Sequence, residues 1–182
     1  MTRRTRLLAI AAITVVTAVA AGGAALADGG DDSRSGVFFI RERLSGFNEN
    51  PSLSTTGSGS FRAQVNERTQ EITYTLTYAN LEGPVTQAHI HFGQPWQNAG
   101  IVVFLCTNLA NGPAGTQLCP EAPATVTGTL TPADVIGPTA QGITAGQFEE
   151  FLAAVRAGVT YANVHSALYP AGEIRAQIEH HH

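Results

Sequence analysis

The chain has 182 residues, of which 43% are hydrophobic and only 13% charged, and its formal net charge is −4. A chain of this length forms one domain with a hydrophobic core of its own. Its acidic balance disfavours nucleic acids and anionic membrane surfaces as partners.

The N-terminal segment has the pattern of a secretory signal peptide. Three arginines within residues 1–6 precede an apolar run over residues 7–21, and Ala25-Leu26-Ala27 then matches an A-x-A cleavage pattern. We expect residues 1–27 to be removed on export and the polar residues 28–35 to form a loose leader. Retention as a membrane anchor is the alternative, because the apolar run is at the short end of what spans a bilayer.

Period-2 alternation of apolar side chains predicts a mostly β domain. The strongest signal is Glu71–Tyr78, in which large apolar residues alternate with threonines. The other expected strands are Val37–Leu44, Ser60–Val65, Val85–Phe92, Gly100–Cys106, Thr125–Leu130, Val159–Ser166 and Gly172–Ile178. About eight strands, with Gly/Pro turns and one packed helix, predict a Greek-key, immunoglobulin-like β-sandwich or barrel.

One helix is expected between the sixth and seventh strands. Apolar side chains recur at helical spacing from Phe148 to Val155, which predicts an amphipathic helix over Thr144–Ala157. Thr144 and Gln147 have the spacing of a capping box at its start. A shorter helical start is expected at Thr131-Pro132, where proline occupies the first helical position.

The two cysteines, Cys106 and Cys119, predict a disulfide. One bridge is the default for a pair of cysteines in an oxidising compartment. It would close a turn-rich loop and stabilise the fold by roughly 3 kcal/mol. A redox or metal-binding thiol pair is the less favoured alternative, because the pair lacks C-x-x-C spacing.

Three internal histidines form the main candidate site. His89 and His91 are two apart on an expected strand, so both rings point to the same face. Imidazole suits copper and zinc, and His165 supplies a third ligand if its strand lies beside the first. The alternative is that all three are hydrogen-bonded structural residues. Three ring nitrogens within about 2.0–2.2 Å of one point would indicate a metal site.

Three charged residues are secondary candidates. Glu173 and Arg175 share a face of the last expected strand and form either a surface ion pair or a support for the metal and its substrate. Glu49 lies in a turn, where a structural role is expected. Glu179 and His180–His182 resemble the remnant of an affinity tag, and we exclude this tail from the fold. The sequence has no nucleophile elbow, phosphate loop or H-E-x-x-H motif.

Four segments resemble the CHRD (chordin-type) domain family over residues 36–178. They are Leu44–Pro51 (the L-x-G-x-N-E-x-P opening), Ile72–Leu81 (a long strand), Ala88–Gly93 (A-H-I-H-x-G) and Tyr161–Ile178 (Y-x-N-V-H-T followed by P-x-G-E-I-R-G-Q). Ser166 replaces the usual threonine and Ala176 the usual glycine. The resemblance implies an extracellular, immunoglobulin-like β-barrel whose molecular role is generally unclear.

A weaker resemblance is to copper/zinc superoxide dismutase. Ala88–His91 is similar to its His-x-His strand, and Gly172–Arg175 to a late segment whose arginine guides the anion. The dense second set of histidines and the aspartate that hold zinc are missing from this chain. The resemblance therefore implies copper rather than zinc.

Taken together, these patterns favour a secreted or extracytoplasmic module that is not an enzyme. Its partner is expected to be an extracellular macromolecule or a metal ion, with His89, His91 and His165 either structural or holding one copper. The alternatives are a superoxide dismutase-like copper enzyme in which Arg175 guides substrate, and a copper storage or delivery protein. An enzyme needs an open coordination position and a cationic entrance.

Overall fold

The computed structural model of the protein describes residues 36–179. In this range one antiparallel sheet contains eight strands in the order β5-β4-β7-β8-β1-β2-β3-β6. The strands are β1 (Val37–Ser45), β2 (Ser58–Asn66), β3 (Glu71–Ala79), β4 (Val85–Phe92), β5 (Ile101–Thr107), β6 (Ala124–Leu130), β7 (Thr160–Ser166) and β8 (Ile174–Ile178). The three-residue 3₁₀ helices are η1 (Gly46–Asn48), η2 (Pro132–Asp134) and η3 (Thr139–Gln141), and the α-helix is α2 (Phe148–Arg156).

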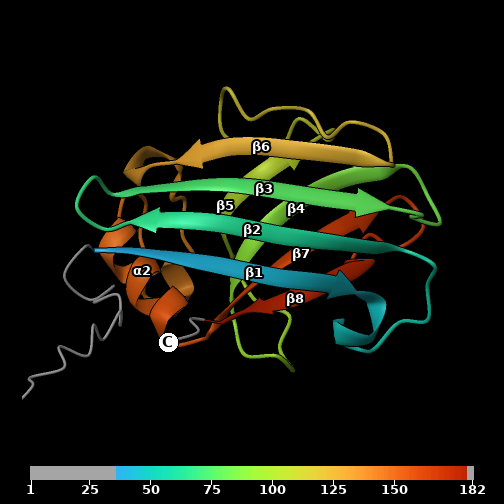
Figure 1. The fold of residues 1–182 in the computed structure, drawn as a ribbon, viewed down its shortest axis with the longest axis horizontal. Coiled ribbons are helices and arrows are strands. Elements are labelled where there is room, and N and C mark those ends of the chain that lie inside the picture. Colours follow the sequence, from blue (N-terminus) through green and yellow to red (C-terminus); the bar gives the residue numbers. More distant parts are fainter. Residues whose placement is uncertain (1–35, 180–182) are drawn as a thin grey trace, which may run out of the picture. The chain divides into compact units, whose positions relative to one another are not determined.

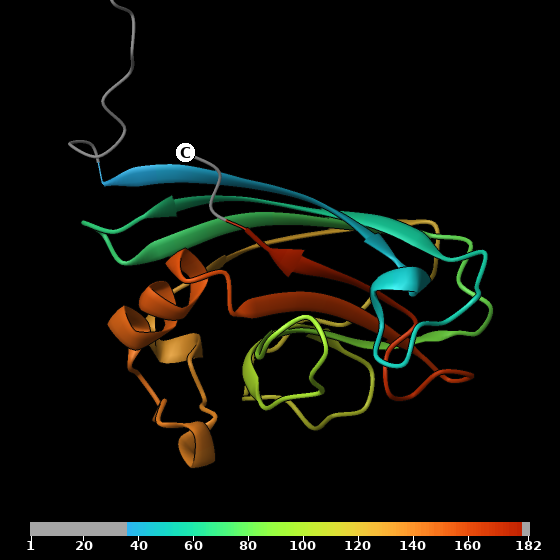
Figure 2. The ribbon, with the colours of Figure 1, turned by 90° about the horizontal axis from the view of Figure 1, so that it is seen from below.

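The predicted fold class is confirmed. The sheet folds into two layers, β1, β2, β3 and β6 on one side and β4, β5, β7 and β8 on the other (Figures 1 and 2). The terminal strands β5 and β6 contact each other, so the sheet is a nearly closed barrel. The expected signal peptide, the leader and the terminal histidines lie outside the described residues.

The β2–β3 hairpin forms as its sequence predicts. Leu76 pairs with Phe61 and Ile72 with Val65, and all four side chains are buried in the core. Tyr74 also reaches across the core, where its hydroxyl donates to the carbonyl of Leu105 in β5 at 2.9 Å. Strict alternation therefore buries one face of the hairpin and leaves the threonine face outside.

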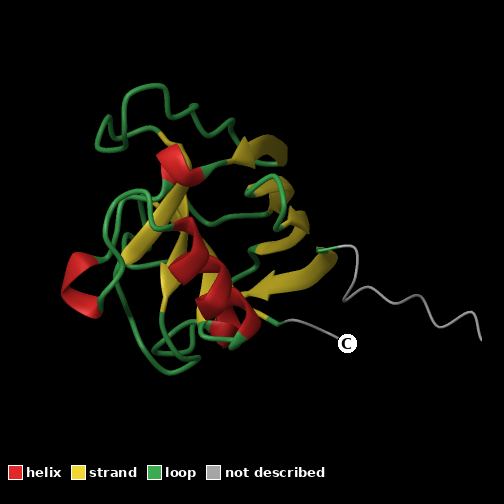
Figure 3. Cartoon of the chain, turned by 90° about the vertical axis from the view of Figure 1, so that its left-hand side faces the viewer, coloured by secondary structure: helices red, strands yellow, loops and turns green. Residues whose placement is uncertain are grey.

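The helix begins later than the capping pattern predicted. Helix α2 starts at Phe148 rather than Thr144, because Gly146 has a left-handed φ of 84° that breaks the helical path. Only half of the expected capping box forms, in which Thr144 N–H donates to Gln147 Oε1 at 2.6 Å. The apolar stripe is correct, and α2 lies across one end of the two layers (Figure 3).

The last expected strand is also shorter than predicted. Strand β8 begins at Ile174 rather than Gly172. Gly172 has a φ of 132°, a conformation that belongs to the turn before the strand. Glu173 therefore precedes the ladder, and only Arg175 of this charged pair lies in the strand.

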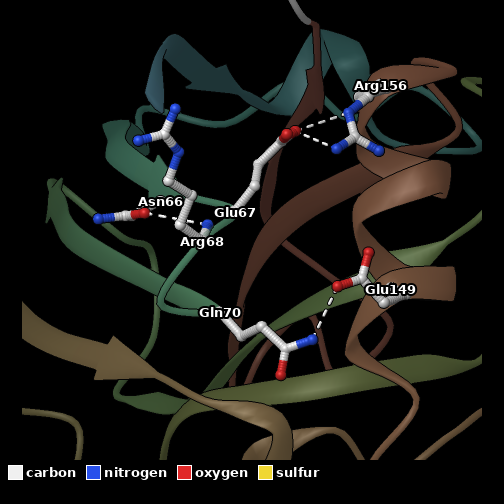
Figure 4. A network of polar contacts seen from close by, with 6 residues as sticks. All are labelled: Asn66, Glu67, Arg68, Gln70, Glu149 and Arg156. Carbon is white, nitrogen blue, oxygen red and sulfur yellow. Dashed lines mark hydrogen bonds and ion pairs between the residues drawn. The ribbon is translucent and has the colours of Figure 1, made fainter. Parts of the chain in front are cut away.

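Polar contacts fix α2 to the β2–β3 hairpin (Figure 4). The guanidinium of Arg156 makes an ion pair with Glu67, and its Nε donates to Glu67 Oε1 at 2.7 Å. Gln70 Nε2 donates to Glu149 Oε1 at 2.7 Å. These contacts are exposed, so their main effect is to orient the helix rather than to stabilise it strongly.

The predicted disulfide is confirmed between Cys106, at the end of β5, and Cys119, in the connection to β6. Both half-cystines are buried against the core. Among residues 36–179, none of the helices has the length and apolar character needed to cross a bilayer.

Candidate metal centre

The three histidines lie on the outer side of the β4–β7 pair. In β4, Ile90 points into the hydrophobic core, so His89 and His91 point away from it. Antiparallel pairing places Asn163 opposite His89 and Tyr161 opposite His91, which brings His165 to the same face of β7. Strand pairing therefore joins the two parts of the predicted site.

This outer face is closed to solvent. The exposed fractions are 1% for His89, 7% for His91 and 5% for His165. The connection between β4 and β5, here called the covering segment (residues 93–100), lies on the side of β7 that faces away from the β1–β2–β3 layer (Figure 2). The histidines thus belong to a second, polar core outside the hydrophobic one.

Hydrogen bonds orient the three rings. His91 Nδ1–H donates to the carbonyl of Ala99 at 2.8 Å, and His165 Nδ1–H donates to that of Pro170 at 3.0 Å. Because a carbonyl can only accept, Nε2 of both neutral rings carries a lone pair. A ring oriented through an Nδ1–H to carbonyl bond is the usual arrangement of a metal-ligating histidine.

The ring nitrogens converge. One nitrogen from each of His89, His91 and His165 lies within 4.8 Å of the others. His89 Nδ1 is 3.1 Å from His165 Nε2. Two nitrogens that each bind a metal at 2.0–2.1 Å are about 3–3.4 Å apart. In the metal-free protein this pair is a hydrogen bond in which His89 Nδ1–H donates to the lone pair of His165 Nε2. The spacing also suits two ligands on one ion, which would displace that proton.

Burial keeps the histidines neutral. It lowers the pKa of His91 and of His165 to about 4, and it lowers the pKa of His89 still further, assisted by the charge that His165 would carry. At neutral pH all three rings are therefore uncharged, the form in which imidazole binds a metal, although the lone pair of His165 Nε2 accepts from His89 in the metal-free protein. Nε2 of His89 and Nε2 of His91 are buried without a hydrogen-bond partner, an expensive state for a polar atom.

Aromatic and cationic groups complete the polar core. The rings of His91 and Tyr161 stack, with centroids 4.7 Å apart and planes inclined by 7°. The guanidinium of Arg175 lies 3.3 Å from the centroid of the same Tyr161 ring. Because β4 and β8 flank β7, Tyr161 lies between His91 and Arg175.

Arg175 holds the covering segment. Its side chain is 1% exposed, and it donates to the carbonyls of Gln97 and Gln94, each at 2.9 Å. Tyr161 assists, because its hydroxyl accepts from Ala99 N–H at 3.0 Å. Because the guanidinium of Arg175 donates to backbone carbonyls, a structural role is favoured over the guidance of an anion.

Glu49 lies in the same polar core. It follows η1, is 7% exposed, and its Oε1 has no hydrogen-bond partner. Burial raises its pKa to about 7, against the opposing effect of the Arg175 charge. A Cβ at position 172 would lie 2.5 Å from Glu49 Oε1 and 2.8 Å from Asn163 Nδ2. Gly172 therefore makes room for this carboxyl group.

Glu173 interacts with a different part of the molecule from Arg175. Its Oε1 accepts from Thr55 Oγ1 and from Glu82 N–H, both at 2.7 Å. The side chain is fully buried and joins the β1–β2 and β3–β4 connections. The geometry thus places Glu49 near Asn163 and Arg175 against Tyr161, two β7 residues on the face of His165, whereas Glu173 makes its hydrogen bonds elsewhere.

Sequence reasoning missed Tyr161, Asn163 and the covering segment. The two β7 residues precede His165 at spacings of four and two, so strand parity alone was enough to place them on its face. The role of the covering segment had no such signal, because its backbone carbonyls, rather than particular side chains, receive the hydrogen bonds.

The family model of the CHRD domain matches residues 40–178, nearly the whole described chain. The chain belongs to the CHRD domain family. Comparison with curated proteins and with solved structures produced no significant match. The matched range contains both strands that carry the histidines, so the candidate metal centre is part of the CHRD domain itself.

Proposed function

We propose that this CHRD chain is an exported binding module that holds one copper ion at His89, His91 and His165. The observation that carries the proposal is the convergence of three buried, neutral imidazoles from two neighbouring strands. Nitrogen ligands bind copper more tightly than the other divalent first-row metals, and the cluster contains no thiolate or carboxylate that would favour another ion.

Two further observations support export. Residues 1–27 have the charge, apolar run and cleavage pattern of a signal peptide. The Cys106–Cys119 disulfide suits an oxidising compartment.

The enclosure of the site supports binding rather than turnover. No ring of the three histidines is more than 7% exposed, and a catalytic metal needs a coordination position that substrate can reach. Arg175, the candidate for anion guidance, is bonded to the covering segment instead. A metal in this site would reinforce the contact between β4 and β7.

Copper titration and metal analysis test the proposal. The terminal histidines are first replaced (His180→Gln, His181→Gln, His182→Gln) so that only the internal site is measured. One tightly bound copper per chain is expected, and electron paramagnetic resonance should show nitrogen ligands. Gln87→Ala, on the same face of β4, is the matched control and should retain the metal.

The His89→Ala/His91→Ala variant should lose this copper while it keeps the native circular dichroism spectrum. Equal copper binding by the variant and the parent would refute the site. A superoxide assay on the loaded protein separates the alternatives, since turnover that disappears in the double variant would identify a redox enzyme. Rapid transfer of copper to a weak chelator would instead indicate a delivery protein.

A further inference from the structure

The outward face of the β1–β2–β3–β6 layer carries an unusual array of polar side chains. Strand register places Arg41 directly opposite Arg62, and Arg43 opposite Ser60. Thr75 and Thr77 of β3 continue these two rows. We call this surface, made of Phe39, Arg41, Arg43, Ser60, Arg62, Gln64, Thr73, Thr75, Thr77, Thr125, Thr127 and Thr129, the arginine–threonine face.

Its three arginines make no ion pair within residues 36–179. Arg41, Arg43 and Arg62 are exposed, and none of the hydrogen bonds and ion pairs found among residues 36–179 uses their guanidinium groups. Like charges directly opposite each other on neighbouring strands are destabilising. Glu42 pairs with the core residue Phe61 and therefore points to the other side of β1, whereas Glu71, the first residue of β3, shares the parity of Thr73 and lies at one end of this face, four positions from the residue opposite Arg62.

The concentration of positive charge contrasts with the rest of the chain. Residues after 27 include seven arginines and fourteen acidic residues, counted from the sequence. Three of those seven arginines lie on this one face, beside one another. On an acidic protein, a local cationic surface attracts an anion, whereas the rest of the molecule repels it.

The remaining side chains suit a sugar. Six threonines form directly paired rows, Thr73 with Thr129, Thr75 with Thr127 and Thr77 with Thr125, and present hydroxyl groups along the sheet. Phe39 is 55% exposed and lies opposite Gln64, next to the Arg41–Arg62 pair. An aromatic ring accepts the apolar face of a sugar, and hydroxyl and amide groups bond to its oxygens.

Arg62 lies between two shallow depressions. One, of about 770 Å³, is lined by Arg43, Arg62, Ser60 and Thr125 among others. The second, of about 200 Å³, is lined by Phe39, Arg41, Arg62 and Gln64 among others. Between Ser58 and Gln64, β2 alone extends about 20 Å, which is the length of a short oligosaccharide rather than of a single ion.

We propose that the arginine–threonine face binds an acidic polysaccharide. Its sulfate or carboxylate groups contact Arg41, Arg43 and Arg62, a sugar ring packs on Phe39, and the threonine rows bond to hydroxyl groups. Single-stranded nucleic acid fits less well, because it requires several stacking aromatics and this face has one. The proposal is independent of the metal centre, which lies on the outer side of the opposite layer.

Calorimetric titration with a heparin octasaccharide tests this surface. With three ion contacts, affinity should fall roughly 20- to 40-fold between 50 mM and 200 mM salt. Arg62→Ser should weaken binding roughly five-fold. Arg156→Ser, which removes the same charge from a distant site, is the matched control and should leave the affinity unchanged.

Phe39→Ala separates sugar recognition from general attraction to anions. It should weaken octasaccharide binding while the dependence on salt stays the same. Equal affinity for an oligothymidylate of the same charge, or equal loss in Arg62→Ser and Arg156→Ser, would overturn the proposal. Because none of these side chains belongs to the hydrophobic core, the variants should fold and unfold in a single transition like the parent, which a thermal scan checks.

Discussion

Strands β3 and β7 show how differently the two layers of this barrel are used. In β3, buried residues alternate with exposed or half-buried ones, so one face contacts the core and the other contacts solvent. In β7, every residue is buried. The second layer therefore lies between two cores, an apolar one inside and a polar one that contains the histidines outside. The burial of both faces of β7 therefore reflects the candidate metal centre on one side as well as the packing of the hydrophobic core on the other.

The largest expected effect comes from the apolar core. Phe61 is fully buried and packs against Tyr74 with ring centroids 6.2 Å apart, so Phe61→Ala should lower the free energy of unfolding by roughly 3–5 kcal/mol. Thr75→Ala, on the outer face of β3, should change it by less than about 0.5 kcal/mol. Urea unfolding measures both. Similar losses of unfolding free energy in Phe61→Ala and Thr75→Ala would contradict the difference between the buried and the outer face of the β2–β3 hairpin.

The polar core should make the metal-free protein sensitive to acid. The folded pKa of each histidine lies below the unfolded value of 6.5, so the stability that the neutral rings contribute is present above pH 6.5 and is lost as the pH falls toward 4. Each histidine should lose about 1.5 kcal/mol between pH 6.5 and pH 5.

Glu49 opposes this trend. Its folded pKa of about 7 lies above the unfolded value, so its contribution is present at low pH and is lost as the pH rises through 7. It offsets the loss from about one histidine, which leaves a net decrease of about 3 kcal/mol between pH 6.5 and pH 5. Urea midpoints measured across this range check the value. A flat profile would contradict the buried, neutral state of the rings.

Arg175 should matter for the covering segment more than for the barrel. Arg175→Met removes two hydrogen bonds to the segment and the contact with Tyr161, and should cost roughly 2–3 kcal/mol. Hydrogen exchange should become faster in residues 93–100 than in β2 and β3. Arg175→Lys should not restore protection, because one ammonium group cannot reproduce the guanidinium fork. Uniform acceleration throughout the sheet would instead assign Arg175 to global stability.

Among the changes at buried positions, the smallest expected loss is that of Gly172→Ala. A Cβ would meet Glu49 Oε1 and the backbone has a φ of 132°, so the variant should lose about 1–2 kcal/mol. Adding Glu49→Ala should recover part of this loss, because it removes the conflict with the carboxyl group but neither the conflict with Asn163 Nδ2 nor the backbone strain. A double-mutant cycle measured by thermal unfolding detects the coupling. Strict additivity would show that the carboxyl group and Gly172 act independently.

Local sequence patterns were sufficient to predict most of the strands and the shared face of His89 and His91. The alternation of Glu71–Tyr78 specified a half-buried strand because side chains on a strand alternate with period two. The same rule placed His89 and His91 on one face. It failed where a local conformation outweighed a motif. Gly146 delayed the helix despite the Thr144–Gln147 pattern, and Gly172 delayed the last strand despite the parity of Glu173 and Arg175.

The sequence by itself determined the class of fold, the disulfide pair and the faces of the strands, because these depend on spacing along one segment or on the presence of only two cysteines. Only the tertiary structure decided that β7 lies between β4 and β8. That order brings His89 and His165 together although 76 positions separate them, and it places Tyr161 between His91 and Arg175. Strand order depends on how all the apolar faces pack at once, and no local pattern contains that information.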